Sequence, residues 1–102
     1  MKQKSKKKQK KIDGIPVKQL WDLRGAIIKY ILPRLKAFKK MKRMGYPGGL
    51  TEEKWEAILD EMIVGLELCH KDDKGELNNL KDIRRASKGW KLFAKWFGDL
   101  WD

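Results

Sequence analysis

Acidic side chains near the middle of the chain have a spacing that could support chemistry. Glu52, Glu53 and Glu56 read E-E-x-x-E, and residues three and four apart share one face of a helix. Carboxylate oxygens gathered on one face are the ligands that a hard cation such as Mg²⁺ prefers. The spacing therefore raises the hypothesis of a magnesium site at the start of a helix.

This string is similar to the one with which MazG-like, all-helical nucleotide pyrophosphohydrolases hold magnesium. That family also needs E-x-x-D on a following helix, and the nearest stretch, 76–79, ends in Asn79 where the aspartate belongs. Glu52 and Glu53 also follow Thr51, a good N-cap, and the helix dipole favours acids in a first turn. We expect an ordinary acidic helix start with no metal, no cofactor and no enzymatic activity. A magnesium-dependent pyrophosphohydrolase is the alternative.

The remaining reactive residues form no recognisable site. Glu67 and His70 have the E-x-x-H spacing of di-iron bundles, which need two such motifs, whereas the chain has one histidine. Cys69 and His70 are adjacent, so on a helix they point about 100° apart and cannot act as a dyad. A single cysteine also excludes an internal disulfide.

Charge is distributed very unevenly along the chain, whose net charge is +11. Residues 1–12 carry seven lysines and no acid, and residues 13–44 carry nine basic residues against two acids. Residues 45–70 reverse the sign, with six acids against one lysine. Coulomb attraction draws such a chain to polyanions, while its acidic segment can also dock on its own basic one.

We therefore predict binding to nucleic acid without sequence specificity, through the N-terminal tail and the basic half of the first helix. Tyr30, Phe38 or Tyr46 could add base stacking. The predicted contact residues are Lys6, Lys7, Lys8, Lys10, Lys11, Arg34, Lys36, Lys39, Lys40, Lys42 and Arg43. A merely solubilising tail, or a nuclear import signal in a nucleated cell, are the other interpretations of residues 1–12.

Hydrophobic periodicity predicts an all-α fold, a small bundle of three or four helices. Residues 1–12 form a disordered tail, and residues 13–102 form one helical domain. We expect a helix over 16–44 that Pro33 kinks near residues 30–32 and that Gly45 ends as a left-handed cap. An antiparallel helix over 52–70 and a third over 76–101, with Gly89 as a point of breakage, complete the domain. No stretch approaches the ~20 apolar residues of a membrane span.

The apolar positions of these helices predict the core. Its expected members are Leu20, Trp21, Leu23, Ile27, Ile31, Leu35, Phe38, Trp55, Ile58, Leu59, Met62, Ile63, Leu66, Leu77, Leu80, Ile83, Phe93 and Phe97. The aromatic C-terminus covers an arc of about 200°, more than one packing face requires. Trp90, Trp96 and Trp101 are therefore candidates for binding a host protein or a second copy in a homodimer, with simple core packing or a membrane-surface helix as alternatives.

Three stretches together resemble a group of short, uncharacterised proteins of tailed bacteriophages. They are W-D at 21–22 followed by I-L-P-R-L at 31–35 with Phe38, G-Y-P-G-G-L-T-E-E-K-W-E-A-I-L-D-E-M-I at 45–63, and the ending G-W-K-L-F-A-K-W-F at 89–97 with L-W-D at 100–102. The resemblance covers residues 20–102 and leaves out the lysine tail. It implies action in the cytoplasm of a bacterial host, and it carries no activity to transfer.

Overall fold

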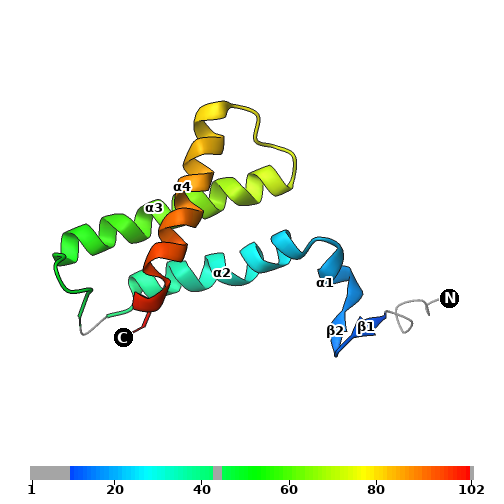
Figure 1. The fold of residues 1–102 in the computed structure, drawn as a ribbon, viewed down its shortest axis with the longest axis horizontal. Coiled ribbons are helices and arrows are strands. Elements are labelled where there is room, and N and C mark those ends of the chain that lie inside the picture. Colours follow the sequence, from blue (N-terminus) through cyan, green and yellow to red (C-terminus); the bar gives the residue numbers. More distant parts are fainter. Residues whose placement is uncertain (1–9, 43–44, 102) are drawn as a thin grey trace.

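Two long helices pack against a third, and a short arm precedes them (Figure 1). The computed structural model describes residues 10–42 and 45–101. The elements are β1 (Lys11–Ile12), β2 (Ile15–Pro16), α1 (Val17–Trp21), α2 (Leu23–Lys40), α3 (Glu52–Asp73), α4 (Leu80–Trp96) and the 3-10 turn η2 (Phe97–Asp99). The predicted all-α small bundle is confirmed, and the hairpin of β1 and β2 is the one piece of β-structure in the described ranges.

α3 is the helix against which α2 and α4 pack. It begins as predicted, because the Thr51 hydroxyl accepts a hydrogen bond from the Lys54 backbone N–H at 3.1 Å. The main core consists of buried side chains of α3 with one from α2: Trp55, Leu59, Met62, Leu66 and Leu35. A smaller cluster joins Ile28 of α2, Cys69 of α3 and Ala86 of α4. Trp90 of α4 packs against both clusters, so all three long helices contribute to the interior.

α3 and α4 meet backbone to backbone at Gly65 and Gly89. A Cβ built on Gly89 would lie 2.5 Å from the Gly65 Cα, and a Cβ on Gly65 would likewise collide with the Gly89 Cα. Glycine at both positions therefore allows an approach that any side chain would prevent. Gly89 does not break the last helix as predicted, and it is instead the point where that helix crosses α3.

The first long helix breaks at a different place from the one predicted. α2 runs unbroken through Pro33, and the interruption lies at Asp22, which leaves the helical conformation. The Asp22 carboxylate accepts a hydrogen bond from the Gly25 N–H at 3.1 Å and so caps α2 as a new helix. Pro33 and Lys29 are both exposed, so water can satisfy the Lys29 carbonyl that proline leaves without a donor.

The ends of the helices also differ from prediction. α2 stops at Lys40 because Met41 turns to an extended conformation, so Met41 and not Gly45 is the C-cap. α4 begins at Leu80, after the Asn79 side chain accepts a hydrogen bond from the Asp82 N–H at 2.8 Å. The third helix is therefore shorter at both ends than the predicted 76–101.

The N-terminal boundary shifts because of a hairpin. Asp13 and Gly14 have positive φ and form the turn between β1 and β2, so Lys11 and Ile12 are structured instead of belonging to the predicted tail. The Val17 N–H donates to the Lys10 carbonyl at 2.9 Å and joins the hairpin to α1. Residues 1–9, the rest of that predicted tail, lie outside the described residues. We call residues 10–21 the arm.

Part of the predicted core is exposed. The exposed members are Trp21, Leu23, Ile27, Leu80, Ile83 and Phe97. The shape of the molecule explains them, because α4 crosses α3 steeply and its first turns stand clear of α2, while the arm extends from the body (Figure 1). Trp21, at the end of the arm, is 79% exposed. The other predicted core residues are buried or half-buried.

The glycine contact generates a stability prediction. Gly89→Ala should lower the free energy of unfolding by about 1–2 kcal/mol. The new Cβ would meet the backbone of α3, so the overpacking cost lies toward the upper end of about 1–3 kcal/mol and exceeds the ~1 kcal/mol that alanine gains in a helix. Urea denaturation measures the change. Gly48→Ala is the control, since a Cβ there meets nothing within 4 Å. An unchanged or higher stability of Gly89→Ala would contradict the close contact.

Candidate nucleic-acid interface

Two of the α2 lysines predicted to bind nucleic acid are held by α3. Lys36 Nζ lies 2.8 Å from a Glu67 carboxylate oxygen. Lys39 Nζ lies 3.3 Å from Asp60 and 3.5 Å from Glu56, and the hydrogen bond to Asp60 raises the pKa of Lys39. The acidic helix thus docks on the basic one, as the charge distribution of the sequence allowed.

The other predicted cations do not gather on one surface of the described residues. The Arg34 guanidinium lies 3.8 Å from the centroid of the Tyr30 ring and donates to the Tyr30 carbonyl at 2.9 Å. Lys40 and Lys42 are exposed at one end of α2, and Lys10 and Lys11 are exposed on the arm at its other end (Figure 1). The rest of the predicted set lies outside the described residues: Lys6, Lys7, Lys8 and Arg43.

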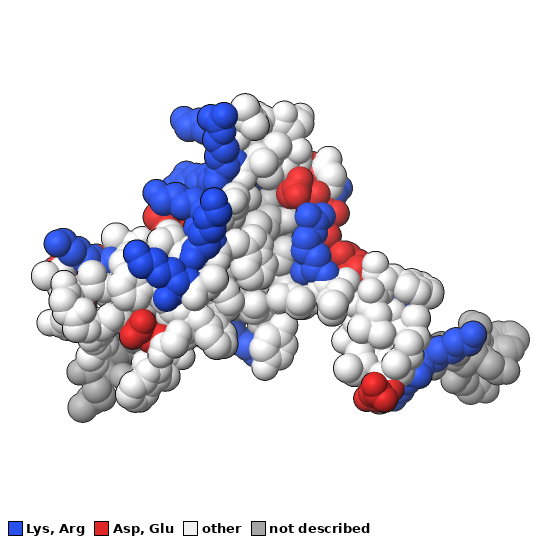
Figure 2. Space-filling view, in the orientation of Figure 1, with Lys and Arg blue, Asp and Glu red and all other residues white. Residues whose placement is uncertain are grey.

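A continuous basic surface runs instead along α4. This helix contains six basic residues against one acid, Asp82. Five of the basic residues recur at steps of three and four along one face, and all five are exposed: Lys81, Arg84, Lys88, Lys91 and Lys95. We call these five residues the α4 ridge, which spans about 21 Å at 1.5 Å per residue. Figure 2 shows the basic side chains gathered along this helix.

The aromatic side of α4 fixes the direction of the ridge. The rings of Trp96 and Trp55 meet edge to face at 5.7 Å, and Trp90 and Phe93 do the same at 5.7 Å. These side chains pack against the main core and leave the ridge turned to solvent. In the described part of the chain no ridge residue forms an ion pair, although Lys95 Nζ lies 5.4 Å from the Trp96 ring centroid.

The ridge could have been found from the sequence by following the helical period. Counted over residues 71–102, eight basic residues stand against six acids, which hides the surplus. Five of those acids, Asp72, Asp73, Glu76, Asp99 and Asp102, lie outside α4. Averaging charge over a stretch longer than the helix therefore removed the signal.

The three tryptophans predicted to bind a partner have different surroundings. Trp90 and Trp96 are half-buried and pack against the main core. Trp101 follows η2 and is 73% exposed. Trp101 is thus the one of the three whose ring is largely open to a partner.

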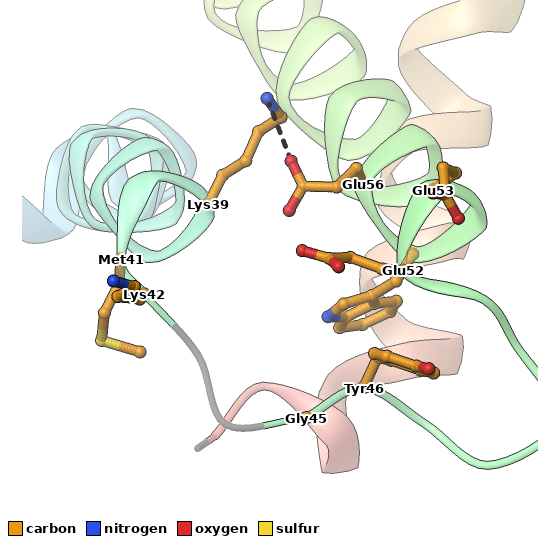
Figure 3. Close-up of a pocket in the computed structure, with 9 residues that line it drawn as sticks. Lys39, Met41, Lys42, Gly45, Tyr46, Glu52, Glu53 and Glu56 are labelled. Atoms are coloured by element: carbon orange, nitrogen blue, oxygen red, sulfur yellow. Dashed lines mark ion pairs between the residues drawn. The ribbon is translucent and has the colours of Figure 1, made fainter.

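A cleft between the end of α2 and the start of α3 holds the glutamates whose spacing suggested magnesium. Its volume is about 680 Å³. Figure 3 shows Glu52 pointing into the cleft, Glu53 pointing away from it, and Glu56 directed at Lys39. Within the described ranges, no group of three or more potential ligands is placed to hold a metal. Lys39 and Lys42 line the cleft together with these glutamates, so it carries charges of both signs.

No protein-family model, curated protein or solved structure matches this chain. Among the helices of the described ranges, none has the length and apolarity that crossing a membrane requires.

The ion pair beside the ridge predicts a pH dependence. Arg85 donates to Glu61 at 2.9 Å, and this hydrogen bond lowers the pKa of Glu61 from its ordinary 4.5. A lowered folded-state pKa adds stability above the unfolded-state pKa, and this stability is lost as the pH falls through the folded-state value. Glu61→Gln should lower the free energy of unfolding by about 0.2–1 kcal/mol at neutral pH, the amount that an exposed ion pair contributes. This deficit should vanish in acid, where Glu61 is protonated in the natural chain as well.

Urea unfolding at several pH values checks this prediction. Glu76→Gln removes an exposed carboxylate that forms no ion pair among the described residues, so it is the matched control. A Glu61→Gln deficit that stays constant down to acid pH would contradict the assigned role of the pair.

Proposed function

We propose that this protein binds nucleic acid without sequence specificity, as a basic accessory protein with no catalytic role. The observation that carries the proposal is the α4 ridge, a row of five exposed cations on one rigid helix. Phosphates of one DNA strand recur about every 3.4 Å along the duplex axis, so a ridge about 21 Å long can contact several of them in succession. Such contacts position a protein on the backbone without reading bases.

The chemistry of the ridge favours phosphate over bases. Four of its five members are lysines, which act as compact point charges, and Arg84 is the single member with a planar guanidinium whose rigid donor fork suits base edges. Binding through such contacts is weak, roughly micromolar or poorer at physiological salt.

The lysine tail extends the same proposal. Residues 2–9 carry five lysines in the sequence, and Lys10 and Lys11 continue the run on the arm. The ridge and the arm lie on different parts of the molecule, so a long polyanion can engage both (Figures 1 and 2). The resemblance to bacteriophage proteins supports an action in the cytoplasm of a bacterial cell.

Removing ridge charge should weaken binding in a predictable way. With five phosphates engaged, the ridge should contribute about −4.5 to the slope with which log K falls with log salt on duplex DNA, and contacts by the tail add to it. The variant Lys88→Gln/Lys91→Gln/Lys95→Gln should reduce the magnitude of this slope by about 0.9 for each phosphate that is no longer neutralised. Fluorescence anisotropy on a labelled duplex at several salt concentrations measures both quantities.

A matched control separates the ridge from net charge. Lys29→Gln/Lys54→Gln/Lys74→Gln removes the same charge from exposed lysines outside the ridge and the arm. We expect this control to retain most of the affinity and the slope. Equal reductions in the two variants, or binding that does not respond to salt, would refute the ridge as the interface.

Deleting residues 2–9 tests the tail independently. Because these residues contribute five lysines, the deletion should flatten the salt slope while the far-ultraviolet circular dichroism of the helical body stays unchanged. Anisotropy and circular dichroism on the same preparation check both halves of the prediction. An unchanged slope would show that the tail makes no phosphate contacts.

A further inference from the structure

α2 and its C-cap residue present a mainly apolar, exposed stripe that a single arginine interrupts. Its residues alternate at spacings of four and three along the chain: Leu23, Ile27, Tyr30, Arg34, Ala37 and Met41. All six are exposed, Tyr30 by 62%. We call this stripe the α2 seam. Its spacing is the one with which two helices pack along their whole length.

Apolar residues also flank the seam, which fits a helical partner. The flanking positions include Ala26, Ile31, Pro33 and Phe38. Arg24, which also flanks it, is already neutralised by Asp72 and Asp73 of α3, at 3.2 and 3.1 Å. Apart from Arg34 and the terminal Lys40, the contact surface therefore carries little free charge.

We propose that two copies of this chain associate through their α2 seams, antiparallel and related by a two-fold axis between Tyr30 and Arg34. In this register Tyr30 faces Arg34 of the second copy, Ile27 faces Ala37, and Leu23 faces Met41. The guanidinium of Arg34 already lies over the Tyr30 ring within one chain, so the same stacking can be exchanged between copies. Ile27 meets the smaller Ala37, and the two helix dipoles oppose each other.

The two ends of α2 explain why the occupant is a second copy. At one end the arm extends from the body with Ile12, Ile15 and Trp21 exposed, and its main contacts are internal or with α2. At the other end lies an open cleft of about 460 Å³, lined in part by Tyr46 and Trp101. Figure 1 shows that a single chain cannot join them, because the arm and the C-terminus lie at opposite ends of α2. Antiparallel pairing brings each arm to the other copy's cleft.

The interface area supports a role for the arms. A stable interface buries about 800 Å² on each partner, and α2 alone is a rod of about 27 Å. The seam needs the additional surface of the arm to reach that size. A two-stranded hairpin is marginally stable alone, so docking against a second copy would also stabilise the arm.

Salt separates this association from nucleic-acid binding. Each copy carries a net charge of +11, so two copies repel one another and added salt should strengthen the dimer. Binding to a polyanion responds to salt in the opposite direction. Treating the sample with nuclease removes any nucleic acid that could bridge two copies, so a dimer that remains is held by protein contacts.

Analytical ultracentrifugation of the full chain tests the proposal. We expect a monomer–dimer equilibrium whose dissociation constant rises about tenfold or more in Ile27→Glu. Ile83→Glu is the matched control, because Ile27 and Ile83 are 41% and 43% exposed on their helices. Circular dichroism verifies the fold of both variants. A monomer at every concentration, or a dimer weakened equally by both variants, would overturn the proposal.

Cysteine cross-linking tests the antiparallel register without a disruptive charge. Positions 27 and 37 lie about 15 Å apart on one helix, so Ile27→Cys/Ala37→Cys cannot close a disulfide within a chain. We expect this variant to oxidise to a covalent dimer, whereas Ala37→Cys alone and the natural chain, whose Cys69 is buried, should not. Efficient cross-linking through Ala37→Cys alone would mean a parallel pair and would overturn the register.

Discussion

The backbone contact between Gly65 and Gly89 is the constraint on which the remaining arrangement depends. Because the two helices touch without intervening side chains, α4 crosses α3 at a fixed point, with Ala86 buried one turn before the crossing. The residues after the crossing, Trp90, Phe93 and Trp96, reach the main core. The turns before it extend past the body and leave Leu80 and Ile83 exposed. The same crossing turns the basic face of α4 outward along its length.

α3 supplies the charges that hold its neighbours in place. The ion pairs described above all set a carboxylate of α3 against a cation of α2 or α4. Those with α2 extend from Lys39 near one end of α2 to Arg24 near the other. Each exposed pair contributes little stability. Together they pair the acidic residues on the sides of α3 that face α2 and α4 with basic residues of those helices. The surplus positive charge is therefore found on the outer face of α4 and on the arm.

Features encoded locally could be predicted from the sequence, and features set by distant contacts could not. The start and the buried face of α3 followed from the Thr51 cap and from an unbroken apolar period. Asp13-Gly14 is a typical hairpin turn, and Asp22 is a typical N-cap, so both signals were present in the sequence and were overlooked. The exposure of Trp21 and Ile27 could not be predicted, because it depends on the direction in which the arm extends and on which face of α2 packs against α3. Sequence alone shows that a face is apolar, but not whether another helix reaches it.

The two proposed associations use different helices and reinforce each other physically. Self-association through the α2 seam has to overcome the repulsion between two chains of charge +11. A polyanion bound along the α4 ridges would remove that repulsion, and thermodynamic linkage then requires the dimer to bind the polyanion more tightly than the monomer does. A dimer also carries two ridges, so once one ridge is bound the other meets phosphates at a high effective concentration. Weak, non-specific contacts on each copy can in this way add up to stable association with a long nucleic acid.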